Sequence, residues 1–378
     1  MRNCRVCFRK ISDQPLLRFE NMPAVAQNFP NADTVKDDHG VDLEVVQCLG
    51  CGLVQLTGEP VPYYRDVIRA SAFSPAMGEF RRNQFTAFLK KYSLLNKKII
   101  EIGCGRGEYA ALMQECGAHV FGLEHLASSV AACLNSNLQV AQGFVEGPEK
   151  KIPGAPFDAF FILNFMEHIP DLNSFLQGIS SNLSENAIGL VEVPNFDMIL
   201  RERLFCEFMT DHLYYFTKES LRTVLSLNGF EVIECSEVWH SYILSAVLKK
   251  RSRTNLQLFN NYQDQLEQEM NTYLSQFPPL SVAVWGAGHQ ALAVLALAKL
   301  KGRIKYVIDS APFKQGKLTP ATHLPIVPPK TLEDDNTLMA VIVLGASYSD
   351  EIVLHLRAHY RKNLSIAVLR SNGLEIIK

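Results

Sequence analysis

The stretch KKIIEIGCGRGEY at residues 97–109 constrains the fold more than any other part of the chain. An isoleucine-rich apolar run ends at Glu101, glycines follow at positions 103, 105 and 107, and apolar residues then recur at helical spacing. This order predicts a strand, a glycine turn and a helix. Glycines let a backbone approach a ligand without an intervening Cβ, and a helix N-terminus offers N–H groups that have no partner within the helix. The stretch therefore predicts the ligand-binding edge of an α/β sheet.

Two carboxylates indicate which ligand this turn binds. Glu101 precedes the glycines, and the turn lacks the Lys-Ser or Lys-Thr pair that holds phosphate and magnesium in nucleotide loops. A second apolar run ends at Glu124, about 20 residues after Gly103, where an acid meets ribose hydroxyls in dinucleotide-type folds. Carboxylates favour a ligand with a diol and a cationic group, as in S-adenosylmethionine. Another doubly wound cofactor domain is the alternative, because such domains share the glycine triplet.

Composition excludes several classes of protein. A chain of 378 residues with 47% hydrophobic and 20% charged residues is ordinary for a globular protein of two or three domains. The formal net charge of −2 argues against a nucleic-acid surface, which needs clustered lysines and arginines. No uncharged run of 18 apolar residues occurs. We expect a cytoplasmic protein, a monomer or weak oligomer, that binds neither nucleic acid nor membranes.

Four cysteines near the N-terminus have the spacing of a metal site. They form two pairs, Cys4-x-x-Cys7 and Cys48-x-x-Cys51, within a loop-rich segment of residues 1–64. Four thiolates suit tetrahedral zinc and leave no open coordination position, so we expect structural Zn²⁺ rather than catalytic Zn²⁺. Reduced bystander thiols or a redox pair are the alternatives. The other five cysteines lack such spacing and are expected to be buried and inert.

Alternating strand and helix patterns predict an α/β fold with a Rossmann-like, doubly wound sheet over residues 78–250. A hairpin within residues 231–248 is expected to close this sheet. A further strand, glycine turn and helix begin at residue 281 and predict a smaller Rossmann-like α/β domain over residues 277–378. A glutamine-rich helix, within residues 255–276, is expected between the two domains. The strands predicted for the central domain are residues 99–103, 118–124, 138–141, 159–163 and 188–193.

The cofactor is expected at one edge of the central sheet, because ligands of such sheets bind outside the carboxyl ends of the strands. Gly143 and Phe144 are expected to approach the adenine, and Asn164 to lie near the methionine end. His168 either lines the same crevice or is a buried structural histidine. The residues expected to bind the cofactor are Glu101, Gly103, Cys104, Gly105, Gly107, Glu124, His125, Phe144 and Asn164.

A polar and aromatic cluster follows the fifth predicted strand. Asp211 and His212 are adjacent, so on a regular strand or helix their side chains point apart, and one must turn aside if both act together. An imidazole titrates near neutral pH, which suits proton abstraction, although a lone histidine is as often structural. Upstream, residues 63–77 mix aromatics, arginines and serines without a clear period. This segment either lines the substrate site or is a plain connector.

The glycine turn of the third region offers backbone N–H groups that suit a phosphate. Gly286 and Gly288 follow a predicted strand, and His289 begins the next helix. Lys314 and Lys317 follow a later strand and are placed to meet an anion. We expect this domain to bind a nucleotide, with packing alone as the alternative.

Taken in order, these motifs resemble the nucleotide-sugar C-methyltransferases of deoxysugar pathways, whose core is a class I methyltransferase. The resemblance covers nearly all of the chain and rests on the cysteine pairs, CGLVQL, EIGCGRG, MEHIPD, EVPNFD, GAGHQAL and DSAPFKQGKLTPATHLPI. It implies S-adenosylmethionine as cofactor and a 4-keto-6-deoxy sugar on a nucleoside diphosphate as substrate. It also implies that the C-terminal domain shares in holding the nucleotide. The implied chemistry is proton abstraction beside the ketone, giving an enolate that attacks the methyl group.

The family's catalytic segment, approximately Y-H-E-H-L-x-Y-F, resembles residues 209–216. His212 falls on the family's general base, Asp211 on a glutamate and Met209 on a tyrosine. An upstream tyrosine of the family falls on Arg69, which is expected to stabilise an enolate or to hold an anion. The resemblance thus implies His212, Asp211 and Arg69 as catalytic residues. The residues expected to bind the substrate are Tyr64, Ser71, Asn195, Tyr215, Gly286, Gly288, His289 and Lys314.

The absent tyrosines leave two other functions open. One is transfer of the methyl group to an oxygen or nitrogen of a sugar nucleotide or related metabolite. The other is a member that binds the cofactor without catalysis. The cofactor site is the same in all three cases; the two enzymes differ in the acceptor, and the third member transfers no methyl group.

Overall fold

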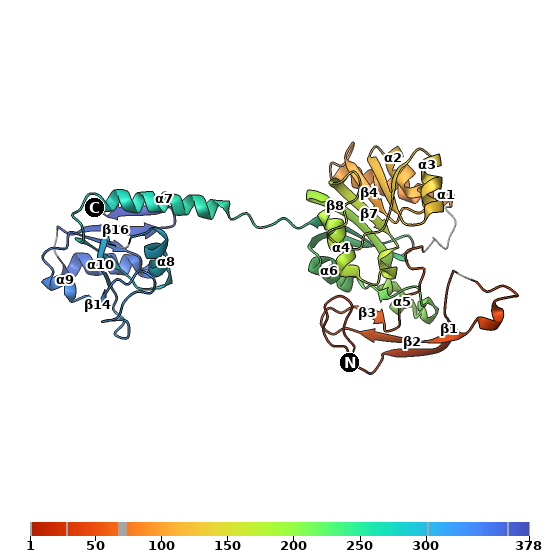
Figure 1. The fold of residues 1–378 in the computed structure, drawn as a ribbon, viewed down its shortest axis with the longest axis horizontal. Coiled ribbons are helices and arrows are strands. Elements are labelled where there is room, and N and C mark those ends of the chain that lie inside the picture. Colours follow the sequence, from red (N-terminus) through yellow and green to blue (C-terminus); the bar gives the residue numbers. More distant parts are fainter. Residues whose placement is uncertain (1, 28, 67–73, 301, 361–362, 378) are drawn as a thin grey trace. The chain divides into compact units, whose positions relative to one another are not determined.

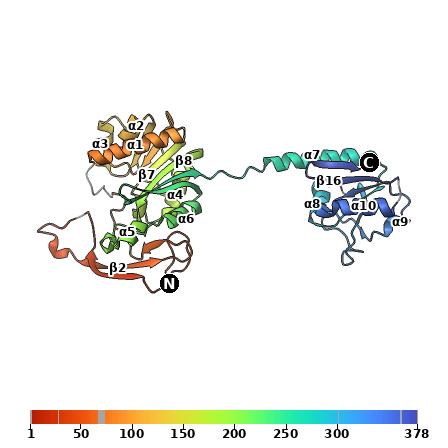
Figure 2. The ribbon, with the colours of Figure 1, turned by 180° about the vertical axis from the view of Figure 1, so that it is seen from behind.

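The computed structural model describes residues 2–27, 29–66, 74–300, 302–360 and 363–377. The chain forms two compact units, Met1–Ser252 and Arg253–Lys378. Figures 1 and 2 show both units with their elements labelled. No helix within the described ranges is long and apolar enough to cross a bilayer.

A four-stranded sheet lies in the N-terminal part of the first unit. Its strands, in spatial order, are β1 (Leu17–Pro23), β2 (Gly40–Gln47), β3 (Val54–Leu56) and β9 (Tyr214–Tyr215). Every neighbouring pair is antiparallel. β9 comes from far along the chain, and its Tyr215 pairs with Val54 of β3. Main-chain hydrogen bonds therefore tie the N-terminal segment to the central domain.

The second sheet of this unit has seven strands. Their spatial order is β10 (Phe230–Val238), β11 (Ile243–Lys250), β8 (Leu183–Pro194), β7 (Phe157–Leu163), β4 (Lys98–Ile102), β5 (His119–Glu124) and β6 (Gln139–Gln142). The strands from β8 to β6 are parallel, whereas β11 and β10 are antiparallel and form a hairpin. The predicted strands and hairpin are confirmed. The carboxyl ends of the parallel strands meet at one edge.

Helices cover both faces of this sheet, because alternate residues of a strand point to opposite sides. Ile99 of β4 packs on the side of α1 (Pro75–Lys91), α2 (Glu108–Glu115) and α3 (Ala127–Asn135). Ile100 packs on the other side, with α4 (Leu172–Ser181) and α6 (Lys218–Leu227). α5 (Phe196–Glu202) instead lies beside the N-terminal sheet (Figure 1), and its Phe196 belongs to the core of that sheet. Short 3₁₀ turns complete the unit: η1 (Val35–Asp37), η2 (Met166–His168) and η3 (Phe205–Glu207).

The second unit is built on a six-stranded sheet. Its spatial order is β14 (Ile326–Val327), β13 (Ile304–Ile308), β12 (Val282–Trp285), β15 (Ala340–Val343), β16 (Ser365–Arg370) and β17 (Gly373–Ile377). All neighbours are parallel except β17, which is antiparallel to β16.

Four helices flank this sheet within the described part of the second unit. One face packs α7 (Gln257–Leu274) and α8 (His289–Leu297), and the other packs α9 (Thr331–Asp334) and α10 (Ser349–His359), which follows η4 (Ala346–Tyr348). The glutamine-rich helix expected between the domains is α7. It belongs to the second unit, because its Met270 and Tyr273 are buried in that core.

Candidate active site

The glycine turn predicted from residues 97–109 lies between β4 and α2. Gly103, Gly105 and Gly107 all have positive φ angles, of 72°, 55° and 88°, which side-chain-bearing residues rarely adopt. A Cβ at Gly105 would meet no protein atom within 4 Å, so the space beside this residue is open. Cys104 is different, because its side chain is buried in the core below the turn and contributes no functional group to the surface. The turn can therefore bring its backbone against a ligand.

Glu124, at the end of β5, is bound to this turn. Its side chain is 7% exposed, and its two oxygens accept hydrogen bonds of 2.8 Å from the N–H groups of Gly105 and Leu126. A carboxylate has about four lone-pair positions, so two remain for other donors. Glu124 can thus stabilise the turn and still accept hydrogen bonds from a ribose diol.

A pocket of about 340 Å³, counted with the solvent space at its mouth, lies at the carboxyl ends of β4 and β5. It brings together four residues that the sequence singled out as cofactor residues: Gly103, Glu124, His125 and Phe144. The sequence also suggested Gly143. The residues that the sequence analysis missed are Arg65, Ile102, Leu123, Val145, Phe165 and Phe175.

Aromatic rings form one wall of this pocket. The Phe144 ring lies 5.9 Å from Phe175 and 6.5 Å from Phe165, measured between ring centroids. The Tyr64 ring lies 6.0 Å from Phe144, and the Arg65 guanidinium carbon lies 4.9 Å from the centre of the Phe144 ring. Such a wall suits a flat heterocycle such as adenine. The spacing of apolar residues in a sequence cannot distinguish an aromatic ring that lines a pocket from one that packs in the core. Phe165 and Phe175 could therefore not be predicted as pocket residues.

The start of the connector after the N-terminal module lies against this pocket. Arg65 donates to the Tyr64 hydroxyl at 3.0 Å and pairs with Glu146 at 3.2 Å. Asp66 lies 3.8 Å from the imidazole of His125. Tyr64 thus contacts the predicted cofactor site. Arg69 and Ser71, predicted as catalytic and substrate-binding residues, lie outside the described residues.

Glu101 and Asn164 lie at the same sheet edge, although neither lines the pocket in its present shape. Glu101 is 3% exposed near the end of β4. Asn164 follows β7 with a φ of 50°, and its N–H donates to the carbonyl of Glu192 on β8 at 2.9 Å. The strand ends therefore bring both residues near the cofactor turn.

Two imidazoles meet beside the pocket. The His168 ring lies 6.5 Å from Phe165 of the pocket wall and 4.9 Å from His212, between ring centroids. Burial, with a smaller contribution from His168, lowers the pKa of His212 to about 3. Burial also lowers the pKa of His168. Both rings are therefore neutral at physiological pH, and a neutral imidazole has a lone pair that can accept a proton.

Asp211 lies in a turn that is closed by a 3.2 Å hydrogen bond from the N–H of His212 to the carbonyl of Met209. The Asp211 carboxylate is 3% exposed and accepts a hydrogen bond of 2.8 Å from the hydroxyl of Tyr63. Its backbone carbonyl accepts a 2.8 Å hydrogen bond from Nδ1 of His168. Asp211 therefore holds the segment and the neighbouring imidazole in place. The sequence analysis missed Tyr63.

Glu167 is a further buried carboxylate at this site that the sequence analysis did not single out. Its side chain is 1% exposed, and burial raises its pKa to about 8. Its Oε1 lies 3.8 Å from Nε2 of His168. In the sequence, the only indication of this role was that Glu167 stands next to His168 in the motif MEHIPD.

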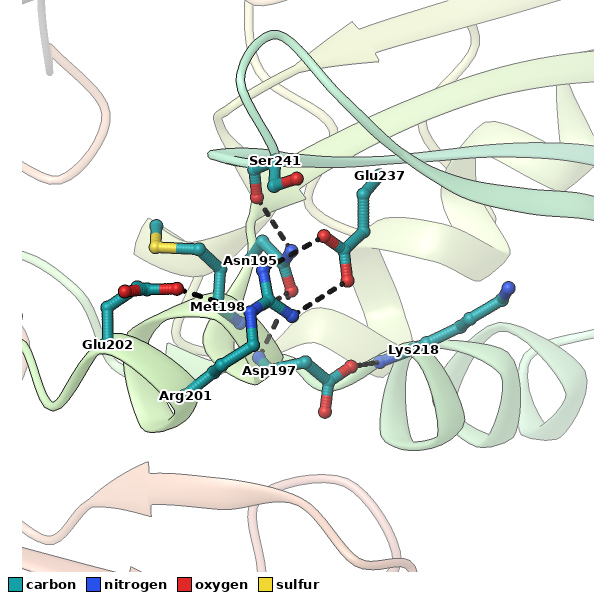
Figure 3. Close-up of polar contacts among 8 residues, drawn as sticks. All are labelled: Asn195, Asp197, Met198, Arg201, Glu202, Lys218, Glu237 and Ser241. Carbon is teal, nitrogen blue, oxygen red and sulfur yellow. Dashed lines mark hydrogen bonds and ion pairs between the residues drawn. The ribbon is translucent and has the colours of Figure 1, made fainter.

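Asn195 and Tyr215, both predicted to bind the substrate, have their side chains engaged within the protein. Figure 3 shows Asn195 at the start of α5, where its Oδ1 accepts from the N–H groups of Asp197 and Met198 and its Nδ2 donates to the carbonyl of Ser241. Asn195 is fully buried. The Tyr215 hydroxyl accepts from the N–H of Met209 at 3.0 Å, and its ring is buried. Tyr215 therefore holds the segment just before His212, whereas Asn195 holds the start of α5 to the loop at Ser241.

The second glycine turn, in the second unit, has its own carboxylate support. Gly286 has a φ of 116°, and the N–H of Ala287 donates to Asp309 at 2.8 Å. Lys314 pairs with the same Asp309 oxygen at 2.8 Å. Burial acts to raise the pKa of Asp309, but Lys314 and backbone N–H groups outweigh it and hold this pKa below its usual value. Gly288 precedes α8, which begins at the exposed His289.

The four N-terminal cysteines converge as a metal site requires. Their sulfur atoms all lie within 4.8 Å of one another, with 3.6 Å between Cys4 and Cys51 and 3.3 Å between Cys7 and Cys48. Sulfurs around tetrahedral zinc are about 3.8 Å apart. Gln55 donates to the Cys4 sulfur at 3.3 Å, which favours the thiolate form. The cluster can therefore hold a metal ion with four sulfur ligands.

Two family models match the chain. A methyltransferase domain matches residues 77–235, and a C-methyltransferase C-terminal domain matches residues 246–368. C-methyltransferase NovU from Streptomyces niveus is 21% identical over 385 residues, which cover 93% of this chain and 91% of NovU. The ubiquinone biosynthesis O-methyltransferase of Chromobacterium violaceum is 30% identical over 95 residues, or 24% of this chain and 40% of that protein.

Solved methyltransferase structures are also similar. An S-adenosylmethionine-dependent methyltransferase from Clostridium acetobutylicum matches with a TM-score of 0.39 and 11% identity, over 50% of this chain and 96% of that one. Magnesium protoporphyrin IX methyltransferase from Synechocystis matches with a TM-score of 0.38 and 14% identity, over 50% of this chain and 93% of that one. The two family models and the near full-length relative agree on the kind of protein. This chain is an S-adenosylmethionine-dependent methyltransferase, in which a methyltransferase domain is followed by a C-methyltransferase C-terminal domain.

Proposed function

We propose that this methyltransferase transfers its methyl group to a ring carbon of a nucleotide-linked 4-keto-deoxysugar. The observation that carries the proposal is the position of the His212 imidazole, 4.9 Å from the ring of His168, which in turn lies 6.5 Å from Phe165 of the pocket wall. Carbon acceptors need a base that removes a proton beside a ketone before the methyl group can be attacked. The likeness to NovU, which is named a C-methyltransferase, agrees with this acceptor class.

The cofactor contributes a methyl group on a positively charged sulfur, which is an electrophile. In our proposal the N–H groups of the turn and Glu124 hold its ribose and Phe144 packs on its adenine. Glu101 and Asn164 lie toward its methionine end. These residues orient the methyl group and exclude water from it, which lowers the entropic cost of reaching the reactive geometry.

In the proposed reaction His212 accepts the proton from the carbon next to the ketone. Asp211 acts as a positioning residue, because its backbone carbonyl fixes the ring of His168, which packs against His212. The enolate that results needs a hydrogen-bond donor or a cation beside its oxygen. We assign that role to Arg69, because the tyrosines of the resembling family are absent from this chain.

The nucleotide of the substrate is assigned to the second unit. The turn at Gly286 and Gly288, with His289 and Lys314, offers backbone N–H groups and a cation beside one helix start. Tyr64 and Ser71 are assigned to the sugar. We further propose that the ion held by Cys4, Cys7, Cys48 and Cys51 is Zn²⁺ and that it is structural.

Replacing His212 tests the base. We expect His212→Ala to abolish methyl transfer while S-adenosylhomocysteine affinity, measured by calorimetry, stays within a few fold. The reason is that His212 lies behind Phe165 and His168 and not in the pocket lining. His240→Ala, at an exposed histidine of the same unit, is the control. Near-normal turnover of His212→Ala on a panel of sugar nucleotides would remove His212 as the base.

A second candidate is O-methylation of a related metabolite. The local match to an O-methyltransferase and the loss of the family's tyrosines favour it. Solvent deuterium separates the two reactions. C-methylation through an enolate exchanges the proton at the acceptor carbon with solvent, whereas transfer to oxygen or nitrogen leaves that carbon unexchanged.

A further inference from the structure

Glu167, His168 and His212 bring three metal-binding groups together outside the cysteine cluster. Their nearest donor atoms all lie within 4.8 Å of one another. Glu167 and His168 end the short turn η2, and His212 reaches them from a segment far along the chain. Only the tertiary fold creates this combination of one carboxylate and two imidazoles.

His168 is oriented as a metal-binding histidine usually is. Its Nδ1 lies 2.8 Å from the carbonyl oxygen of Asp211, and a carbonyl can only accept, so Nδ1 carries the proton. The lone pair is therefore on Nε2, which lies 3.8 Å from Oε1 of Glu167. Metal-bound histidines commonly donate their other N–H to a backbone carbonyl, which fixes the ring and its tautomer.

Glu167 provides a second, independent observation at this cluster. Its side chain is 1% exposed, and among the described residues its Oε2 is buried without any hydrogen-bond partner. A buried polar atom without a partner is costly, so native proteins rarely keep one without a reason. A bound cation would satisfy this oxygen.

We propose that Glu167, His168 and His212 form a binding site for a divalent transition-metal ion of the Zn²⁺ class. Two imidazoles and one carboxylate are a ligand set that Zn²⁺ accepts, with a fourth position left open. Ligands at about 2.1 Å in tetrahedral geometry are about 3.4 Å apart, so the present cluster must contract by roughly 1 Å. Of the three residues, His212 is the most exposed.

The site has a consequence that rests on the proposed function. A metal ion and a substrate proton use the same lone pair of His212, so an occupied site cannot act as a base. Zn²⁺ in excess of the structural ion therefore inhibits methyl transfer, and a chelator restores it. The four-sulfur cluster is a separate site, because its soft ligands are closed around their own ion.

Cobalt titration of the zinc-loaded full-length protein tests this site without any acceptor substrate. We expect one further Co²⁺ per chain, with visible bands of a nitrogen and oxygen site and without the strong near-ultraviolet bands of cobalt thiolate. Glu167→Gln and His168→Asn should each weaken this second site by at least about tenfold. Glu149→Gln, at an exposed glutamate, should leave it unchanged.

Titration with S-adenosylhomocysteine establishes that each variant is folded. The proposed site would be overturned if no second Co²⁺ binds or if the second ion shows thiolate bands. It would also be overturned if both Glu167→Gln and His168→Asn keep the wild-type affinity for the second Co²⁺. A second ion that leaves methyl transfer unaffected would also overturn it, because His212 would not be shared. If no sugar nucleotide of the panel is methylated but the second Co²⁺ still binds, the proposed acceptor is wrong and the metal site is still supported.

Discussion

Glu124, Glu167 and Asp211 are buried carboxylates close to one pocket, and their partners give them different roles. Glu124 accepts from two backbone N–H groups at the turn, and Asp211 accepts from the Tyr63 hydroxyl. Glu167 has one oxygen without a partner among the described residues. A carboxylate whose two oxygens each accept one backbone hydrogen bond still has lone pairs for the hydroxyl donors of a ligand.

Glu124→Ala is expected to weaken S-adenosylhomocysteine binding by about 1 to 3 kcal/mol, the cost of losing a charge-assisted hydrogen bond. Part of that loss comes from the turn, because Gly105 loses its acceptor. Calorimetric titration measures the change, and Glu149→Ala at an exposed site is the control. Equal affinity in Glu124→Ala and the wild-type protein would mean that the ribose binds elsewhere.

The Asp309–Lys314 pair provides a prediction about pH. The pKa of Asp309 is lower in the folded protein than in the unfolded chain, so its stabilisation is complete above about pH 4 and is lost as pH falls through the folded value. Lys314→Met should therefore destabilise the second unit by about 1 kcal/mol at neutral pH. The difference between variant and wild-type protein should shrink below about pH 4. Hydrogen exchange of the amides in β12 and β13 measures it, and a difference that is constant with pH would contradict the assignment.

At the scale of elements, the pairing of β3 with β9 links the cysteine cluster to His212. Gln55 of β3 donates to the Cys4 sulfur and accepts from the N–H of Arg5. The next residue, Leu56, donates to the carbonyl of Leu213, which directly follows His212. The strand that the metal cluster holds is thus the strand that supports the proposed base.

Cys48→Ser is expected to release the metal ion and unfold the N-terminal module, because a four-sulfur site stabilises such a small module directly. Methyl transfer should fall with it, whereas S-adenosylhomocysteine affinity should change less, because the glycine turn lies on another sheet. Elemental analysis gives the metal content and calorimetry gives the affinity. Cys206→Ser, at an exposed cysteine outside the cluster, is the control. Metal that stays stoichiometric in Cys48→Ser would rule out the four-sulfur site.

The whole molecule contains two glycine turns of similar construction, one in each unit. Each follows a parallel strand, precedes a helix, and has an acid at the end of the next strand that accepts from a turn N–H, Glu124 in one and Asp309 in the other. The neighbours of these acids differ. Lys314 neutralises Asp309, whereas Glu124 has no lysine or arginine bridge among the described residues. The first turn therefore suits a cationic cofactor, and the second better tolerates an anionic ligand.

Gly286→Ala separates the two turns. Its φ of 116° is unfavourable for alanine, and a Cβ there would lie 2.7 Å from the carbonyl oxygen of Leu344. We expect nucleoside diphosphate binding to weaken at least tenfold, while S-adenosylhomocysteine binding is unchanged. Gly316→Ala, where a Cβ meets no atom within 4 Å although φ is also positive, is the control for backbone strain. Unchanged nucleotide affinity in Gly286→Ala would leave the second turn with a packing role alone.

The local features of this protein follow from its amino-acid sequence alone. The alternation of apolar residues predicted the strands of the central sheet, and the glycines after Glu101 predicted the turn in which they adopt positive φ angles. The spacing of the cysteine pairs predicted that the four sulfurs converge. The contribution of Glu124 and Phe144 to one pocket also followed from the rule that parallel strands present their carboxyl ends at one edge. The individual catalytic and substrate roles remain predictions.

The contacts between segments that are distant in the sequence are known from the tertiary structure alone. The pairing of β3 with β9, the hydrogen bond from Tyr63 to Asp211, and the position of Glu167 beside His212 join residues far apart in the chain. The same holds for Asn195, whose amide caps α5 and holds the loop at Ser241. Such contacts depend on how all the sheets and helices pack together. They cannot be predicted from a local sequence pattern, because burial and hydrogen bonding across the whole unit determine them.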